Sequence, residues 1–376
     1  MYEVRAPGRV NLIGEHTDYT GGDAMPIATD LHTALTAEPA ATVELRSEAL
    51  DVTGRFDPAG FEADGTWLDY VKGVYHVLRD AGYDPGGVHG TLGGDLPLGS
   101  GLSSSASLEL AVLAFLDSAY DLGLDRRELA RFGQRVENEY VGVACGILDQ
   151  FAVALCREGR ALHIDTGTLS YEPVPIPADA RVLVFHTGVE RGLVDSAYNQ
   201  RRSTVAAALE RLGRESSKTV TDADLSTLPA TERRRVGYLR RENRRVVEAR
   251  DALVAGDLDR FGEVLVTAHR DIAENYEASC PELDFVVRTA VDAAVDSFGG
   301  IDGFVNNAGR ADSYALTDTD ATNWQRTVEL NLTGVYHGCL AAVERMLDDD
   351  GGAIINIGSV FGVAGVDDPD AGQRVG

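Results

Sequence analysis

The most regular hydrophobic pattern in the chain lies at residues 104–120, where apolar side chains such as Leu108, Val112 and Phe115 recur every three or four positions. This spacing predicts a long helix with a broad apolar face. The same spacing predicts further helices over residues 69–80, 126–140, 195–214, 231–255 and 257–276, and one that begins near residue 147.

Shorter apolar or alternating runs predict strands between these helices. They cover residues 43–46, 89–92, 181–185, 304–307 and 353–357. A helical pattern over residues 323–347 separates the last two, and strand, helix and strand at this spacing predict a parallel βαβ unit. The pattern as a whole therefore predicts an α+β protein with a βαβ unit near its C-terminus.

Composition and charge narrow the class of protein. The 376 residues are 44% hydrophobic, which excludes a disordered tail or a low-complexity fibre, and the length allows roughly two to three domains. The formal net charge is -26, so repulsion would oppose binding to a nucleic-acid backbone or an anionic membrane surface. No run of about 18 apolar residues occurs, and the first ten residues lack an apolar core. We expect a cytoplasmic protein without nucleic-acid or membrane partners.

The basic residues are almost all arginine. Only Lys72 and Lys218 are lysines, so 32 of the 34 basic side chains are arginine, set against 60 Asp and Glu. This balance is typical of proteins kept soluble in concentrated salt, although a high-GC genome would also favour arginine. The four cysteines lie far apart without a CxxC pair, so we expect neither a zinc site nor a disulfide framework.

A polar cluster near the N-terminus is the first candidate for chemistry. Residues 8–19 read GRVNLIGEHTDY and are followed by Gly21 and Gly22. The cluster combines one arginine, two carboxylates and a histidine between glycines that let the backbone turn closely around a ligand. Hydroxyl-rich neutral ligands need such fixed polar partners. A solvated polar turn is the alternative.

A second candidate runs into the strongest helix. Residues 95–107 read DLPLGSGLSSSAS, so glycines and hydroxyls precede the helix N-terminus. Free backbone N–H groups and the positive end of the helix dipole favour a bound phosphate there. The stretch matches neither the lysine-containing P-loop nor a dinucleotide fingerprint. A glycine-serine linker that ends in an N-cap is the alternative.

Two carboxylates further along the chain form the third candidate. Glu137 follows the apolar Val136, so it lies at the edge of a buried helix face, and it could bind Mg²⁺ together with Ser105. Asp149 opens the next helix, where the dipole would keep it ionised and able to act as a base. A carboxylate at a helix N-terminus without any chemistry is the alternative for Asp149.

Together these stretches resemble the galactokinases, which belong to a superfamily of small-molecule kinases that also includes homoserine, mevalonate and phosphomevalonate kinases. GRVNLIGEHTDY is similar to the galactokinase signature, and PLGSGLSSSAS is similar to the ATP motif of the superfamily. The similarity continues through VENEYVGVACGILDQF, YNQRR and SCPELD, and covers about residues 1–287.

The resemblance implies a two-domain kinase that transfers phosphate from ATP to the anomeric hydroxyl of galactose or a close relative, with Mg²⁺. It implies Asp149 as the base and Arg9 as the residue that steadies the base and the transferring group. It implies this set of sugar ligands: Glu15, His16, Thr17, Asp18, Gly146 and Tyr198. The implied nucleotide ligands are Ser47 and the run Gly99, Ser100, Gly101, Leu102, Ser103, Ser104 and Ser105, with Ser105 and Glu137 as the implied metal ligands.

The resemblance stops near residue 287. Galactokinases carry a third glycine-rich motif of the form GGGFGGC, which this sequence lacks. From residue 288 the chain instead resembles the middle of a short-chain dehydrogenase, through NNAG at 306–309, NLTG at 331–334 and the serine at 359. The glycine-rich cofactor loop and the YxxxK pair of that family are absent, so Asn331 and Ser359 are interpreted as relics.

The sequence therefore predicts three parts. Residues 1–178 would form the N-terminal kinase domain, residues 179–287 a truncated second kinase domain, and residues 288–376 a partial Rossmann-like βαβ fragment. Galactokinase activity is the leading hypothesis. A sugar- and ATP-binding product of gene fusion or truncation with impaired catalysis is the alternative, and an NAD(P)-dependent dehydrogenase is the weakest.

Overall fold

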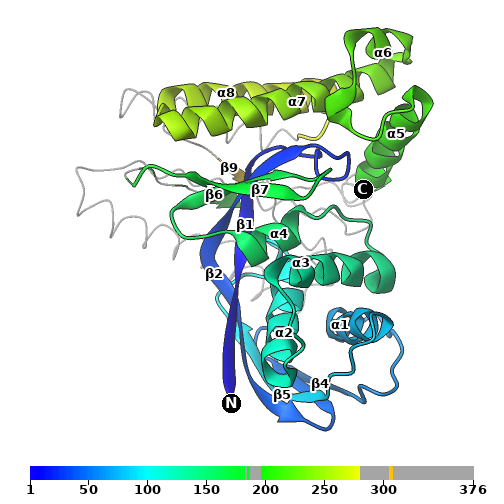
Figure 1. Ribbon diagram of the computed structural model, residues 1–376, viewed down its shortest axis with the longest axis vertical. Coiled ribbons are helices and arrows are strands. Elements are labelled where there is room, and N and C mark those ends of the chain that lie inside the picture. The colour runs from blue at the N-terminus through cyan, green and yellow to red at the C-terminus, as the bar shows by residue number, and fades with distance from the viewer. Residues whose placement is uncertain (179, 181, 183, 187–195, 280–304, 308–376) are drawn as a thin grey trace, which may run out of the picture.

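A mixed seven-stranded sheet forms the framework of the chain (Figure 1). The computed structural model describes residues 1–178, 180, 182, 184–186, 196–279 and 305–307. Strands β4-β3-β5-β2-β6-β7 follow one another in the sheet, and β1 pairs with the other edge of β2. The bounds are β1 Tyr2–Ile13, β2 Asp23–Ala40, β3 Val43–Ser47, β4 Val52–Phe56, β5 Gly87–Gly94, β6 Arg160–Asp165 and β7 Ser170–Pro175.

Strand β2 is unusually long and holds the sheet together. Its C-terminal half pairs with β5, whereas its first residues, Asp23 and Ala24, pair with β6. Strand β1 runs antiparallel to almost the whole of β2. All pairings in this sheet are antiparallel except β3 with β5.

The larger hydrophobic core lies between this sheet and four helices. These are α1 (Leu68–Asp80), α2 (Ser104–Tyr120), α3 (Arg126–Arg135) and α4 (Leu148–Leu155). Helix α2 is central, because Leu113, Phe115 and Leu116 are fully buried against strand and helix side chains. The broad apolar face that the sequence predicts for residues 104–120 is therefore confirmed, with the same bounds.

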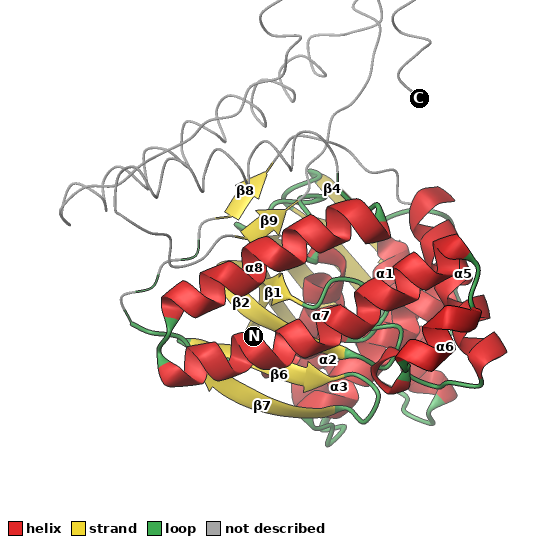
Figure 2. Cartoon of the chain, turned by 90° about the horizontal axis from the view of Figure 1, so that it is seen from above, coloured by secondary structure: helices red, strands yellow, loops and turns green. Residues whose placement is uncertain are grey.

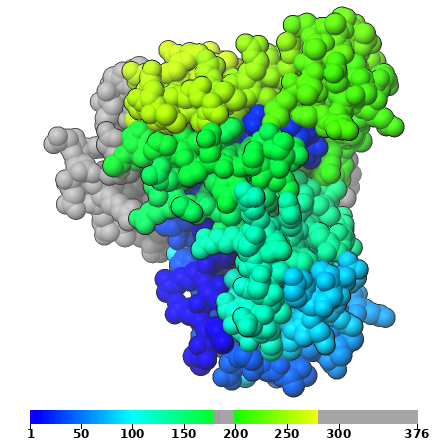
Figure 3. All heavy atoms as spheres, in the orientation of Figure 1, coloured from blue at the N-terminus to red at the C-terminus, as the bar shows by residue number. Residues whose placement is uncertain are grey.

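A second core lies where two antiparallel helices cover β1, β2, β6 and β7. Helix α7 (Ala230–Ala255) and helix α8 (Leu258–Asp271) contribute Val246, Leu253 and Val264 to it. Figure 2 shows this pair lying across the sheet, and in Figure 3 the pair forms the end of the molecule opposite β3, β4 and α1. A small third core joins α7 to α5 (Ser196–Leu212), to α6 (Asp222–Thr227) and to the single-turn helix η2 (Ser217–Thr219).

Two predicted helices end in a π-helical turn, which the hydrophobic pattern does not predict. Residues 126–140 form α3 followed by the π-helix η1 (Val136–Val141), and residues 257–276 form α8 followed by the π-helix η3 (Ile272–Tyr276). Inserted π-turns often mark functional sites. The other predicted helices among the described residues agree with the structure to within a few positions.

The predicted strand at 181–185 corresponds in part to β8 (Val184–His186), which pairs in parallel with β9 (Val305–Asn307). Residues 323–347 and 353–357, on which the predicted βαβ unit depends, lie outside the described residues, as does most of the predicted third part. In the described part of the chain, no helix has the length and apolar character needed to cross a bilayer.

Candidate functional site

Arg9 and Asp149 form the centre of the site. The Arg9 guanidinium contacts Asp149 Oδ1 through Nε at 2.8 Å and Nη2 at 2.7 Å. Its Nη1 donates to the carbonyl of Gly101 at 2.7 Å, and the backbone N–H of Arg9 donates to the carbonyl of Leu102 at 3.0 Å. Arg9 in β1 thus holds both the carboxylate of Asp149 in α4 and the loop that leads into α2. The family resemblance implies that these three parts belong to one site.

The loop before α2 leaves the helix N-terminus available to a ligand. Gly99 and Gly101 take positive φ angles of 70° and 76°, and Ser103, the N-cap, takes 59°. The Ser103 hydroxyl makes no capping bond and instead donates to Asp149 Oδ2 at 2.6 Å. The first backbone N–H groups of α2 therefore have no side-chain cap, and such N–H groups at the positive end of a helix dipole are suited to an anion.

Ser105 and Glu137 meet one turn further along. The Ser105 hydroxyl donates to Glu137 Oε1 at 2.7 Å. Glu137 lies in the π-helix η1 and is only 7% exposed, and its burial, together with the charge of Asp149, raises its pKa. Because a nearby cation would relieve this cost, the pair is suited to a divalent ion.

The donor set indicates which kind of ion fits. Within the described ranges, no group of three or more His, Cys, Asp or Glu side chains is arranged to hold a metal. One hydroxyl and one carboxylate are too few for a transition-metal cage, but they suit Mg²⁺, which commonly takes one or two protein oxygens and completes its shell with phosphate and water. Ser105 and Glu137 therefore fit Mg²⁺ only beside a phosphate.

Asp18 faces the same centre from the loop between β1 and β2. Burial and the charge of Asp149 raise its pKa to about 6, although Arg9 and Arg202 partly offset the shift. Gly146 lies directly against it, because a Cβ at that position would come within 1.8 Å of Asp18 Oδ2. Position 146 therefore requires glycine as long as Asp18 keeps this position.

Aromatic rings line the side of the site near His16. The centroid of the His16 imidazole lies 5.4 Å from that of the Tyr198 ring and 4.6 Å from that of the Tyr276 ring. The Nδ1 atom of His16 lies 2.9 Å from the hydroxyl of Tyr19. The Arg202 guanidinium lies over the Tyr19 ring. Tyr198 and Arg202, the first and last residues of the motif YNQRR, lie four positions apart and therefore on one face of α5. The family resemblance implies a role for Tyr198 but none for Arg202.

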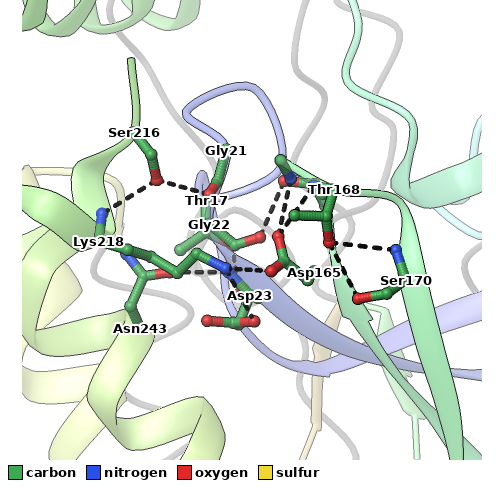
Figure 4. A network of polar contacts seen from close by, with 12 residues as sticks. Thr17, Gly21, Gly22, Asp23, Asp165, Thr168, Ser170, Ser216, Lys218 and Asn243 are labelled. Carbon is green, nitrogen blue, oxygen red and sulfur yellow. Dashed lines mark hydrogen bonds and ion pairs between the residues drawn. The ribbon is translucent and has the colours of Figure 1, made fainter. Parts of the chain in front are cut away.

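The loop that carries Glu15, His16 and Asp18 is anchored through Thr17, which Figure 4 shows beside Gly22 and Asp23. Thr17 is fully buried, and its hydroxyl lies 2.7 Å from the carbonyl oxygens of both Gly14 and Asp23. This hydroxyl shapes the loop from inside, so the sugar contact that the resemblance implies for Thr17 gains no support from its position.

Residues 216–218 and Asn243 hold the end of the same loop. Asn243 Oδ1 accepts from the backbone N–H of Asp23 at 2.7 Å, and Ser216 Oγ donates to the carbonyl of Gly21 at 2.6 Å. Lys218 Nζ lies 2.7 Å from Asp165 Oδ2 and 3.4 Å from Asp23 Oδ1 (Figure 4). Burial would raise the pKa of Asp165, but the bond from Lys218 and two backbone N–H groups lower it overall.

Some residues beside the site have no role implied by the sequence. Three residues reach the site or its floor although they lie outside the motifs: Glu242 in the middle of α7, Tyr276 in η3 three residues before SCPELD, and Glu109 in α2 two residues after PLGSGLSSSAS. Glu109 is fully buried, and burial with the charges of Glu137 and Asp149 raises its pKa well above the usual value. Ser47 closes a turn at the end of β3, where its hydroxyl accepts from the N–H of Leu50 at 3.3 Å, so its nucleotide role stays a prediction.

Three family comparisons match parts of the chain. The galactokinase galactose-binding signature matches residues 2–39, and the GHMP kinases N terminal domain matches residues 69–157. These ranges contain Arg9, the loop anchored by Thr17, the α2 N-terminus and Asp149. The short chain dehydrogenase family matches residues 248–368, a range that includes the described helix α8 and strand β9.

The chain is similar to galactokinases of several organisms. A galactokinase of Thermococcus kodakarensis is 55% identical over 289 residues, which cover 77% of this chain and 83% of that protein. A galactokinase of Pyrococcus furiosus is 50% identical over 289 residues, 77% of this chain and 82% of its own. The crystal structure of Lactococcus lactis galactokinase complexed with galactose superposes with a TM-score of 0.71 at 35% identity, covering 77% of this chain and 79% of that one.

Proposed function

This chain belongs to the galactokinase family, and we propose on that premise that it transfers the γ-phosphoryl group of ATP to the anomeric hydroxyl of galactose. In this reaction the bond between the γ-phosphorus and its bridging oxygen breaks, a bond from the sugar oxygen to phosphorus forms, and the hydroxyl proton leaves. The products are galactose 1-phosphate and ADP.

The observation that carries the proposal is the contact set of Asp149. Arg9 and Ser103 each bond one of its carboxylate oxygens, at 2.7–2.8 Å and 2.6 Å, and Ser103 begins the phosphate-binding helix end. This arrangement supports a carboxylate that receives the sugar hydroxyl proton beside the γ-phosphate. In phosphoryl transfer, positioning and charge neutralisation supply most of the catalysis, and Arg9 supplies both.

The same reasoning gives the remaining residues their proposed roles. Glu15, His16, Asp18 and Tyr198 would bind the sugar hydroxyls, with Gly146 giving Asp18 its room. The run of residues 99–105 would bind the phosphates of ATP through backbone N–H groups, and Ser105 and Glu137 would hold Mg²⁺. When bound, that ion would neutralise charge on the phosphate oxygens.

The segment from about residue 288 requires a separate proposal. We infer that it derives from a short-chain dehydrogenase-like fold, which the family match over residues 248–368 and the parallel pairing of β8 with β9 support. The sequence contains no cofactor loop of that family, so we propose no dehydrogenase chemistry for it.

The proposal is tested by following ADP release in a coupled assay with galactose, with and without Mg²⁺, in low and high KCl. We expect ADP release that depends on both galactose and Mg²⁺. Calorimetric binding of galactose without any ADP release would favour a sugar- and ATP-binding protein that has lost turnover.

A further inference from the structure

Three side chains form a hydrogen-bonded chain beside the loop of residues 14–22 between β1 and β2, here called the sugar loop. The hydroxyl of Tyr276 lies 2.6 Å from that of Tyr19, and the hydroxyl of Tyr19 lies 2.9 Å from His16 Nδ1. Tyr19 and His16 belong to the sugar loop, whereas Tyr276 reaches them from η3. Both distances suit a hydrogen bond, so the question is in which direction the hydrogens point.

The buried end of the chain sets this direction. Tyr276 is fully buried, and within the described ranges its hydroxyl makes no hydrogen bond other than the one with Tyr19. A hydroxyl carries one hydrogen, and a buried hydrogen without an acceptor is costly. Tyr276 therefore donates its hydrogen to the oxygen of Tyr19.

The hydrogen of Tyr19 then has one acceptor. Among the described residues, the hydroxyl of Tyr19 is in hydrogen-bonding range of Tyr276 and of His16 Nδ1 alone. Tyr19 accepts from the first and donates to the second, so Nδ1 is the bare nitrogen and the neutral imidazole carries its hydrogen on Nε2. The opposite direction, from Nδ1 through Tyr19 to Tyr276, would leave the Tyr276 hydrogen buried without an acceptor.

The surroundings of His16 favour a single orientation of its ring. His16 has a φ angle of 65°, a left-handed backbone conformation that residues other than glycine seldom adopt. A half-turn of the imidazole would place a C–H group against the Tyr19 hydroxyl, so the bond to Nδ1 also fixes which edge of the ring is turned away from Tyr19. Tyr276 is held in turn by the ring of Tyr238, whose centroid lies 4.9 Å from its own.

Both tyrosines keep their hydrogens at neutral pH. Burial raises the pKa of Tyr276 to about 12. Burial and the neighbouring Tyr276 also raise the pKa of Tyr19. The chain therefore keeps one direction throughout the physiological pH range.

We propose that Tyr19 is a positioning residue for sugar binding: directed by Tyr276, its hydroxyl keeps the hydrogen of the neutral His16 imidazole on Nε2, so that His16 meets the sugar as a hydrogen-bond donor. The proposal rests on the proposed function, since it concerns the sugar role of His16. It adds that the sugar oxygen facing His16 is an acceptor, and that η3 sets the chemical form of a residue in the sugar loop.

The test is nitrogen NMR of the full chain labelled with ¹⁵N-histidine, without sugar, at pH 8.5, where histidines of ordinary pKa are neutral. The chain has eight histidines, and the signals missing from His16→Gln identify those of His16. We expect the hydrogen on Nε2 and an Nδ1 resonance at the position of a hydrogen-bonded acceptor. In Tyr19→Phe the Nδ1 resonance should move to the position of an unbonded ring nitrogen.

The matched control is Tyr75→Phe. Tyr75 is also fully buried, and its hydroxyl donates to the carbonyl of Gly86 at 3.0 Å in the core with α1–α4. Its loss removes one buried tyrosine hydrogen bond but should leave the His16 signals unchanged.

Two results would overturn the proposal: a hydrogen on Nδ1 of wild-type His16, or an Nδ1 resonance that stays in place in Tyr19→Phe. If Tyr19→Phe does not fold, Tyr276→Phe takes its place. Without the hydrogen of Tyr276, Tyr19 can accept from Nδ1 as well as donate to it, so both neutral forms of His16 should appear. Signals of one form alone would contradict the direction assigned to the chain.

Addition of galactose separates this inference from the proposed function. Galactose should shift the Nε2 resonance of wild-type His16 and leave the hydrogen on Nε2, and its Kd by calorimetry should rise about fivefold in Tyr19→Phe but not in Tyr75→Phe. The expected His16 signals without any response to galactose would contradict only the proposed substrate. A hydrogen that moves to Nδ1 when galactose binds would contradict the donor role of His16.

Discussion

Asp149 shows how strongly one residue can be fixed by its neighbours. Its carboxylate has a charged donor on one oxygen and a hydroxyl on the other. In Asp149→Asn, the amide cannot take a proton from the sugar, but it fills the same space. We expect turnover to fall about 10²–10⁴-fold, the usual contribution of a general base.

The measurement is kcat in the ADP-release assay, together with galactose Kd by calorimetry. The Kd should change little, because the sugar hydroxyls have other partners. Retained wild-type turnover in Asp149→Asn would remove Asp149 from the base role.

The close contact between Gly146 and Asp18 leads to a second prediction. A methyl group there would come within 1.8 Å of Asp18 Oδ2, so Asp18 must move in Gly146→Ala. We expect KM for galactose to rise about tenfold or more, the cost of losing one good polar partner, while KM for ATP stays near the wild-type value.

The matched control is Gly60→Ala, because a Cβ at Gly60 has nothing within 4 Å and its backbone is ordinary. Both KM values should stay at wild type in that variant. Equal changes in the KM for galactose and for ATP in Gly146→Ala would point to general damage to the site instead.

At this scale, sequence motifs identify residues that lie next to a motif and miss those that reach it through the fold. Arg9, Asp149 and Ser103 lie in recognisable motifs, and the structure brings them into contact. Glu242 lies in the long charged helix α7, where nothing local distinguishes it from a surface position, and Tyr276 lies in η3 after α8, close to SCPELD but outside it. Their roles depend on how α7 and η3 pack against the sugar loop, which is a tertiary property.

Among the elements, the short helix η2 and helix α7 act together as a support for the sugar loop. Lys218 bridges Asp23 and Asp165, and its loss leaves two carboxylates facing each other. In Lys218→Ala we expect the free energy of unfolding to fall by about 1–3 kcal/mol, and KM for galactose to rise several-fold as the loop loosens.

The chain offers a matched control in its only other lysine. Lys72 bridges Asp64 and Asp69 at the start of α1, away from the sugar loop. Lys72→Ala should also cost stability in urea denaturation, but it should leave the KM for galactose unchanged. If both variants change KM equally, the effect is one of stability and the support role is wrong.

The helices of this chain have clearer sequence patterns than its strands, for a physical reason. The helix at 104–120 has an uninterrupted apolar period, whereas β2 contains Pro26 and Pro39, and proline usually signals an edge or a turn. Strand β1 contains Pro7 and Gly8, and its register to β2 shifts between Pro7 and Arg9. The two strands that carry the sheet therefore have patterns that are broken where they bend. The π-turns at η1 and η3 leave no local pattern at all.

For the whole molecule, the net charge of -26 leads to a prediction about salt. Excess carboxylates repel one another in the folded chain, and added salt screens this repulsion. We expect Tm to rise as KCl increases from 0.1 M towards 2 M. A Tm that falls steadily over this range would contradict a protein adapted to concentrated salt.

The length of β2 has a consequence for how the molecule comes apart. Leu35 and Ala37 lie in the core with α1–α4, whereas Met25 and Ile27, earlier in the same strand, lie in the core with α7 and α8. Loss of either core would therefore remove packing contacts from β2, which also contributes side chains to the other core. The described sheet and its helices should therefore unfold as one cooperative unit, with a single transition seen alike by fluorescence and by circular dichroism. The sugar loop, which begins where β1 ends and stops where β2 begins, would then persist until that transition.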